Sequence, residues 1–221
     1  MAISVLIIGK SGSGKSASLR NFPADQLGVI NVMGKPLPFR SRLRTLCTTD
    51  YDTIQHVLIQ SKARSIVIDD AGYLITDQFM AGHANIGKGN AVFSLYNDLA
   101  DRFYRLLRYI ADALPYDRII YLIMHEDKND FGDIKPKTIG KMLDEKVCVE
   151  GLFTIVLRSV VENGKYLFKT QTSGFDVTKS PIGLFQSEEI DNDLYAVDQA
   201  IRTYYNIESK EVPDDEKTTE I

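Results

Sequence analysis

The sequence predicts an α/β protein in which helices flank a mostly parallel central sheet, and three observations support this. A strand-like apolar segment, residues 4–8, runs directly into a glycine-rich loop. Further short apolar segments have the composition of strands buried on both faces: residues 27–32, 65–70 and 118–125. Between them, residues 51–62 and 91–114 carry apolar side chains at helical spacing. Alternation of strands and helices is typical of a parallel sheet.

The remaining elements follow from turn and capping signals. Thr49 or Asp50 is expected to cap the helix over residues 51–62, and Asn163-Gly164 is the favoured type I′ hairpin turn. The other expected elements are a helix from residue 16 after the loop, a strand at 43–47, a short helix at 139–146, hairpin strands at 153–161 and 166–172, and a final helix at 193–205.

The length and charge of the chain limit the number of domains and the kinds of partner that it can have. The chain has 221 residues, 44% of them hydrophobic, which is enough for one domain over residues 1–206. From residue 207 the chain is acidic and polar, so residues 207–221 are expected to form a disordered tail. With 26 basic and 30 acidic residues, the net charge of -4 excludes a general attraction to nucleic acid or anionic membrane.

The cysteines and the hydropathy pattern indicate a cytoplasmic protein. Cys47 and Cys148 form neither a C-x-x-C pair nor a zinc-type cluster, which fits a reducing compartment. No apolar run approaches the ~18 residues of a membrane span, and no secretory leader is recognisable. We therefore expect no membrane partner.

The glycine-rich loop has the complete G-x-x-x-x-G-K-S pattern of a phosphate loop. Its backbone amides are expected to surround phosphate oxygens, while Lys15 faces the β and γ phosphates and Ser16 binds Mg²⁺. The helix that follows would add the positive end of its dipole. The residues expected to bind ATP are Gly9, Lys10, Ser11, Gly12, Ser13, Gly14, Lys15, Ser16 and Ala17.

Acidic and imidazole side chains stand at the ends of two predicted strands. Asp69, at the end of an apolar strand, is the expected second Mg²⁺ ligand beside Ser16. Asp70 either orients or deprotonates the attacking water or is a solvated neighbour. His125 is a candidate sensor of the γ-phosphate and Glu126 a second candidate base, the alternative being that both face solvent from the start of a loop.

The order of these motifs resembles the ATPase core of RecA-like recombinases, and in particular the compact bacteriophage ATP-binding proteins related to it. Segments 34–39, 135–141 and 179–181 resemble that phage group, and the likeness extends over about residues 3–205. The resemblance implies a RecA-like P-loop NTPase fold ending in a β-hairpin and helix. It also implies that the strand ending at His125 lies between the phosphate-loop strand and the Asp69 strand.

The resemblance further implies two mobile loops that bind single-stranded DNA, at residues 81–90 and 127–141. Lysines along such loops would pair with DNA phosphates, although ordinary solvated connectors would have a similar composition. The candidate DNA contacts are Lys88, Lys128, Lys135, Lys137 and Lys141.

The chain departs from the family where a catalytic glutamate is expected after the second strand, because Met33 occupies that place. Either Asp70 or Glu126 replaces this base, or ATP acts mainly as a switch for assembly. The resemblance also implies a basic residue supplied by a neighbouring subunit of a homo-oligomeric ring or filament. Lys179 is the candidate, with Lys169 behind it and a solvated lysine as the alternative.

These expectations combine into an ATP- and Mg²⁺-dependent ATPase of phage type, acting in DNA recombination or annealing on single strands in the host cytoplasm. A second reading is an ATP-gated adaptor or loader, with little hydrolysis, for a replication or single-strand-binding protein. A small-molecule or nucleoside kinase is disfavoured because neither long loop contains the arginine cluster of a kinase lid.

Overall fold

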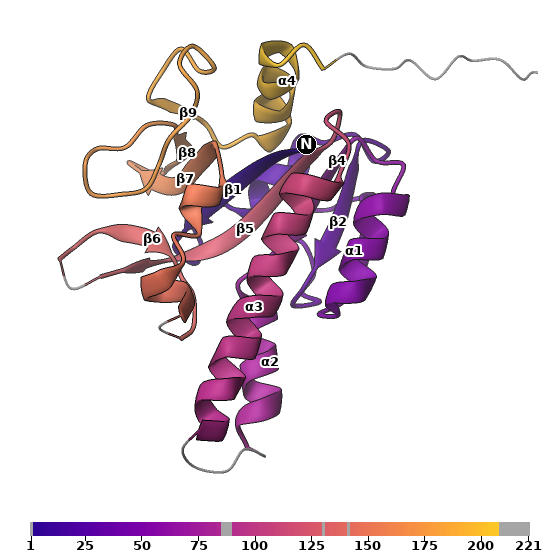
Figure 1. The fold of residues 1–221 in the computed structure, drawn as a ribbon. Helices are drawn as coiled ribbons and strands as arrows, with labels where there is room; N and C mark the ends of the chain where they lie inside the picture. The colour runs from indigo at the N-terminus through magenta and orange to yellow at the C-terminus, as the bar shows by residue number, and fades with distance from the viewer. Residues whose placement is uncertain (1, 85–89, 130, 141, 208–221) are drawn as a thin grey trace, which may run out of the picture.

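The structure is a computed structural model and describes residues 2–84, 90–129, 131–140 and 142–207. Within these residues, nine strands form one mixed, mostly parallel sheet with helices on both faces (Figure 1). The predicted α/β class is therefore confirmed.

The strand order brings the ends of the motif-bearing strands together. Along the sheet the strands are β3 (Arg44–Cys47), β2 (Leu27–Asn31), β4 (Ser65–Asp69), β5 (Ile119–Lys128), β1 (Ile3–Gly9), β7 (Ile155–Glu162), β8 (Lys165–Lys169) and β9 (Glu189–Asp191). All neighbours from β3 to β7 are parallel, whereas β8 and β9 are antiparallel additions. The expected position of β5 between β1 and β4 is confirmed, so three carboxyl ends meet at one edge.

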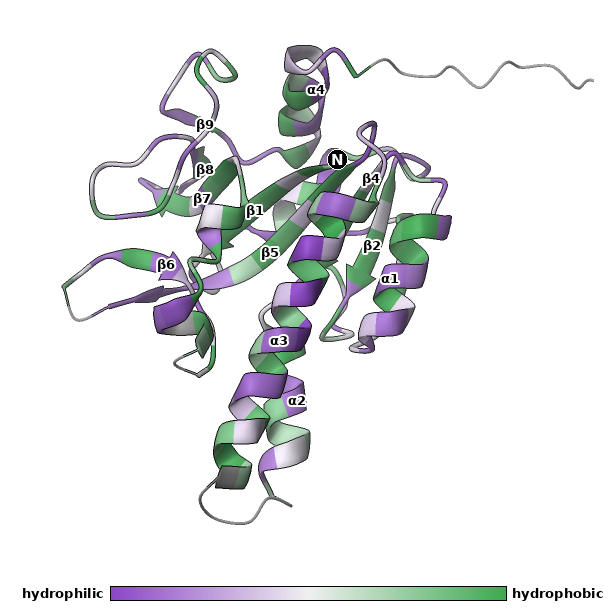
Figure 2. Cartoon of the chain, in the orientation of Figure 1, coloured by the Kyte–Doolittle hydropathy of each residue, from purple (hydrophilic) through white to green (hydrophobic). Residues whose placement is uncertain are grey.

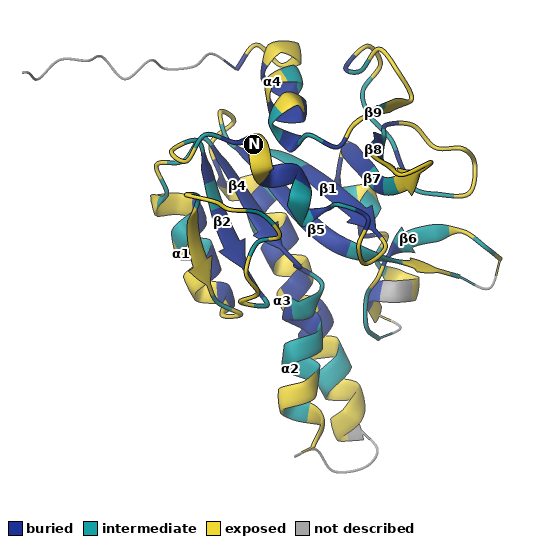
Figure 3. Cartoon of the chain, turned by 180° about the vertical axis from the view of Figure 1, so that it is seen from behind, coloured by how far each residue is buried: buried dark blue, intermediate teal, exposed yellow. Residues whose placement is uncertain are grey.

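Burial on both faces explains why the central strands are apolar throughout. Leu6 and Ile8 pack toward α1 (Tyr51–Gln60), α2 (Tyr73–His83) and α3 (Asn90–Ala113). Val5 and Ile7 pack toward a 3₁₀ helix, η1 (Ser16–Asn21), and toward α4 (Leu194–Tyr204). The central strands are accordingly hydrophobic in Figure 2 and buried in Figure 3.

Local signals located several boundaries correctly. Asp50 is the N-cap of α1, accepting a hydrogen bond from the backbone N–H of Thr53 at 2.8 Å. Asn163 and Gly164 have φ values of 51° and 76°, as a type I′ turn requires. Both cysteines are free. None of the helices in the described part of the chain combines the length and apolar character needed to cross a bilayer.

Other expectations need correction. The short helix expected after the phosphate loop is present, but it is a six-residue 3₁₀ helix, η1, whose dipole is small. The short helix at 139–146 is a π-helical turn, Met142–Lys146, followed by a 3₁₀ turn at Glu150–Leu152. The second hairpin strand ends at Lys169 rather than at 172.

The domain boundary also shifts slightly. Ile207, expected to open the disordered tail, is buried and its backbone N–H donates to the Arg202 carbonyl at 2.9 Å. The rest of the expected tail, residues 208–221, lies outside the described residues.

Candidate functional site

The phosphate-loop motif forms a tight bend between β1 and η1. Gly12 and Gly14 adopt φ values of 78° and 97°, which only glycine adopts without strain. Gly9 lies beneath the bend, where a Cβ would stand 2.5 Å from Ser13 Oγ. The glycine spacing of the motif is therefore required by this backbone path.

Lys15 points back across the bend. Its Nζ donates to the carbonyl oxygens of Gly9 at 2.8 Å and Lys10 at 2.7 Å, and only 6% of the residue is exposed. Burial lowers the pKa of this ammonium, while the charges of Asp70 and Asp69 oppose that shift. Lys15 thus supplies a partly desolvated cation at the floor of the site.

The C-terminal strands hold the bend from the side. Ser159 Oγ, on β7, donates to the Ser13 carbonyl at 2.7 Å, and Asn192 Nδ2 donates to Ser159 Oγ at 3.1 Å. Arg20 donates to the Asn192 carbonyl at 2.6 Å. A Cβ on Gly14 would stand 2.7 Å from the Tyr166 ring, so this ring packs directly on the bend.

Ser16 and Asp69 meet at the carboxyl ends of β1 and β4. Ser16 Oγ donates to Asp69 Oδ1 at 3.0 Å, as expected for two Mg²⁺ ligands from distant parts of the chain. Burial, and then the charge of Asp70, raises the pKa of Asp69 to about 6. No group of three or more His, Cys, Asp or Glu side chains in the described residues could hold a metal unaided. A hydroxyl beside one carboxylate fits Mg²⁺, which keeps several ligands for phosphate and water.

Replacing Asp69 by Asn should stabilise the nucleotide-free protein at neutral pH by about 3 kcal/mol, because the pKa of Asp69 is raised from 3.8 to about 6 and each unit costs about 1.4 kcal/mol. The raised pKa means that stability falls as the pH rises from about 4 to about 6, because in this range the carboxyl ionises in the unfolded chain but keeps its proton in the folded protein. The variant should lack this pH dependence and should bind nucleotide without Mg²⁺ enhancement. Urea unfolding at pH 7.5 and pH 4.5 in EDTA measures the effect, and a less stable variant at pH 7.5 would contradict it.

Asp70 lies directly after β4 in a strained conformation, with φ of 59°. Its carboxylate forms an ion pair with Lys35 at 2.6 Å and lies 3.6 Å from His125 Nε2. Burial, and then the charge of Lys15, lowers the pKa of His125. His125 is therefore a neutral imidazole near pH 7, able to exchange hydrogen bonds with a phosphate or a water.

Glu126 forms an ion pair with Arg158. Arg158 donates to both of its carboxylate oxygens, Nε to Oε2 at 2.8 Å and Nη2 to Oε1 at 3.2 Å, and the Glu126 side chain is only 5% exposed. A general base needs a lone pair directed at its substrate. Arg158 occupies both oxygens of Glu126, whereas Lys35 occupies only Oδ2 of Asp70, so Asp70 Oδ1 is the less engaged of these carboxylate oxygens.

A cleft of about 1270 Å³ lies over the phosphate loop and the ends of β4 and β5; Asp69 is not among its lining residues and is joined to it through the hydrogen bond from Ser16. All the expected loop residues except Gly9 and Ser13 line this cleft. Asp70, His125 and Glu126 line it as well. The cleft also contains side chains to which the sequence analysis gave no role: Arg20, Lys35, Tyr73, Thr76, Tyr166 and Asn192. Of these, Lys35 could have been found, because it follows the glycine turn after a strand that ends at the same edge.

The lysines expected to contact DNA lie in different parts of the structure. Lys137 lines the cleft, and its backbone N–H donates to the His125 carbonyl at 2.8 Å. Lys128 is exposed at the end of β5, and Lys135 lies in β6 (Ile134–Pro136), which pairs antiparallel with β5. Residues 127–141 therefore include an ordered hairpin rather than one mobile loop. Lys88 and Lys141 lie outside the described residues.

Of the other expected DNA loop, residues 81–90, the structure describes only 81–84 and 90, and most of these belong to helices. Its first three residues end α2, and Asn90 begins α3. Ala84 is the C-cap of α2, and residues 85–89 lie outside the described part of the chain.

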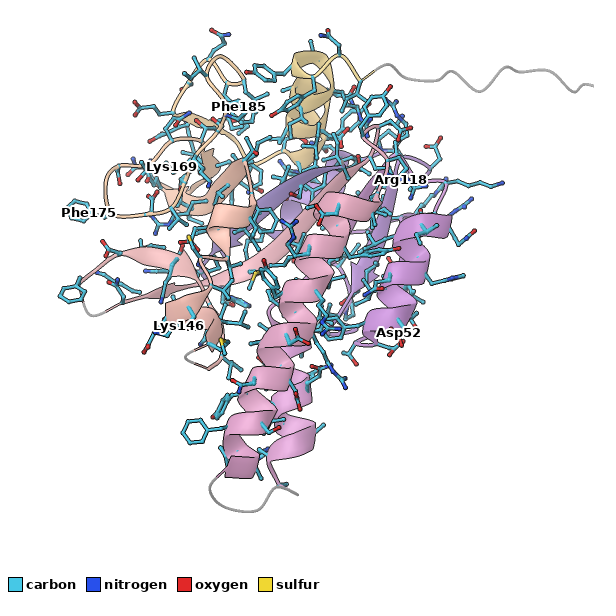
Figure 4. The ribbon with its side chains drawn as sticks, in the orientation of Figure 1. Asp52, Arg118, Lys146, Lys169, Phe175 and Phe185 are labelled. Atoms are coloured by element: carbon cyan, nitrogen blue, oxygen red, sulfur yellow. The ribbon has the colours of Figure 1, made fainter. Side chains whose placement is uncertain are left out.

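The candidate subunit-bridging lysines lie apart from the cleft. The Lys179 backbone exchanges hydrogen bonds with Val156, at 2.8 and 3.0 Å, and Lys179 does not line the cleft. Lys169 is paired with both Glu162 and Glu189 (Figure 4 labels Lys169). A role for Lys179 in a neighbouring subunit's site stays a prediction, whereas Lys169 is already neutralised within its own chain.

Comparison with known proteins identifies no relative on which to base a function. No protein-family model matches the chain, and a search of curated proteins finds no significant match. The function therefore has to be argued from the residues of the cleft.

Proposed function

We propose that the protein is a Mg²⁺-dependent ATPase with a RecA-like core. The observation that carries the proposal is the 3.0 Å contact between Ser16 and Asp69, which unites the phosphate-loop hydroxyl with the acid of a different strand. Lys15 and Ser16 line the same cleft and Asp69 contacts Ser16, so a phosphate-binding loop, a cation and two candidate metal ligands lie together. The position of β5 between β1 and β4 agrees with a RecA-like arrangement.

Each group has a role in phosphoryl transfer to water. The amides of the bend and Lys15 bind the phosphate oxygens, and Ser16 with Asp69 would hold Mg²⁺, which when bound neutralises phosphate charge. Asp70 accepts a proton from the attacking water as the bond to the terminal phosphorus forms and the bridging oxygen leaves with ADP. The neutral His125 beside Asp70 orients the same water.

Calorimetric titration of the wild-type protein with ATP, with Mg²⁺ or with EDTA, tests the binding part of this proposal. Micromolar or tighter binding that requires Mg²⁺ supports it, and absence of binding overturns it. Phosphate release under saturating ATP then separates an ATPase from an ATP-gated adaptor. The adaptor reading, favoured by the lack of a glutamate at Met33, predicts binding with no turnover above background.

We further propose that single-stranded DNA binds the β5–β6 hairpin, which projects from the sheet (Figure 1). Phe131 at its tip is 90% exposed, and Phe175 on the adjacent loop is 66% exposed and points away from the body (Figure 4). The Ile134 backbone N–H donates to the Phe175 carbonyl at 2.8 Å, which joins the two segments. Exposed aromatic rings beside the cation of Lys128 form a surface on which bases stack.

Phe131→Ala should weaken binding of a labelled oligonucleotide about 5- to 150-fold, because stacking contributes about 1–3 kcal/mol per base. Fluorescence anisotropy measures the change. Phe93→Ala is the matched control, since Phe93 is 70% exposed but belongs to α3 rather than to the hairpin, and should leave the affinity unchanged. Equal affinities of the wild type and Phe131→Ala would exclude the hairpin as the DNA site.

A further inference from the structure

Lys35 enters the cleft from a loop that is built to hold it there. It follows Gly34, whose φ of 64° turns the chain at the end of β2. Asn31, buried at the end of β2, donates from Nδ2 to the Lys35 carbonyl at 2.6 Å. A Cβ at Gly34 would stand 2.8 Å from Cys47 Sγ on the neighbouring strand, so glycine is needed at this turn. The Lys35 backbone is thus fixed while its side chain reaches over the site.

The Lys35 ammonium lies at the metal end of the cleft. Its Nζ is 2.6 Å from Asp70 Oδ2 and 5.9 Å from the centre of the Tyr73 ring. The Lys35 side chain is 59% exposed, whereas that of Asp70 is 8% exposed. The lysine is therefore the mobile member of the pair, able to move by side-chain rotation alone.

The charges around Asp70 present a problem for an anionic ligand. Asp69 and Asp70 place two carboxylates next to the position of a terminal phosphate, and Mg²⁺ on Asp69 would offset only one of them. Asp70 would repel the phosphate unless a cation stays with it. Lys15 is already directed into the bend toward Gly9 and Lys10, so Lys35 is the cation in contact with Asp70.

We propose that Lys35 makes the cleft selective for a nucleoside triphosphate over a diphosphate: its ammonium binds the terminal phosphate while it remains beside Asp70. The inference rests on the proposed nucleotide function and adds to it a specificity residue supplied by the same chain. A diphosphate lacks the terminal phosphate that Lys35 would bind. Lys35 then keeps Asp70 as its partner, as it does in the structure.

The test compares the affinities of ATP and ADP, both with Mg²⁺, for the wild type and for Lys35→Ala. The variant should bind ATP at least about tenfold more weakly, through loss of a charge-assisted contact, and ADP less than about threefold more weakly. Lys35→Arg retains the charge and should keep the ATP-to-ADP ratio within about threefold of the wild type. Lys62→Ala, an exposed lysine after α1, is the control for nonspecific loss of charge.

An unchanged ATP-to-ADP ratio in Lys35→Ala would overturn this inference while leaving nucleotide binding intact. Absence of binding to the wild type would instead overturn the proposed function, and this inference with it. A double variant, Lys35→Ala with Asp70→Asn, removes the repulsion as well as the cation. The double variant should recover only part of the wild-type preference for ATP over ADP. Full recovery would show that Lys35 is merely a counter-ion of Asp70 and does not bind phosphate.

Discussion

Lys15→Ala should weaken ATP binding about 100-fold or more, because two charge-assisted contacts of about 1.5–3 kcal/mol each are removed from a polyanion. Burial lowers the pKa of the Lys15 ammonium, so without a ligand the desolvation cost outweighs the attraction of Asp70 and Asp69. The midpoint temperature of thermal unfolding of the nucleotide-free variant should therefore equal or exceed that of the wild type. Titration calorimetry measures the ATP affinity, and differential scanning calorimetry measures the unfolding temperature.

The matched control is Lys10→Ala in the same bend. Lys10 lines the cleft but is exposed, so its charge is screened by water and the loss should remain below about tenfold. Equal losses in the two variants would show that the bend attracts anions only by general charge. Full affinity of Lys15→Ala would place the nucleotide elsewhere.

The apolar strands could be predicted because burial on both faces leaves a local signature. Helix α2 was missed because its middle, Thr76-Asp77-Gln78, interrupts the apolar periodicity. The expected helix after the phosphate loop is short because Pro23 disfavours helical geometry in the preceding residue, and Phe22 is extended with ψ of 133°. Strand β5 continues past the cleft because β6 returns to pair with it, a contact that no local pattern records.

In the site, too, residues with a local sequence signal could be predicted, whereas contacts between distant segments could not. The bend, Lys15, Ser16 and Asp69 are local motifs at strand ends, so their residue types and spacing sufficed. The ion pair of Glu126 with Arg158 depends on how β5 and β7 flank β1, and so could not be read from spacing. Tyr166 and Asn192 reach the bend only because the C-terminal hairpin closes the sheet beside β1.

A buried polar network fixes α4 to the amino ends of β4 and β5, away from the cleft. Arg202 Nε donates to Asp198 Oδ1 at 2.7 Å, with the two side chains 5% and 3% exposed. The guanidinium also donates to the carbonyls of Arg64, at 2.9 Å, and Asp117, at 3.3 Å. Tyr121 donates to the other Asp198 oxygen at 3.0 Å. Arg202 therefore compensates a buried carboxylate and two backbone acceptors at once.

Arg202→Ala should lower the free energy of unfolding by about 3–5 kcal/mol, because it leaves the Asp198 charge buried without its partner. Arg108→Ala is the matched control: it breaks an Arg–Asp pair of the same spacing and the same 2.7 Å length, but with both side chains 49% exposed, and should cost less than about 1 kcal/mol. Replacing Asp198 by Leu and Arg202 by Met together should cost less than Arg202→Ala alone, since no uncompensated charge remains. Urea unfolding of the four proteins measures these differences. Equal costs for Arg202→Ala and Arg108→Ala would mean that water reaches Asp198 and that α4 is not fixed through this pair.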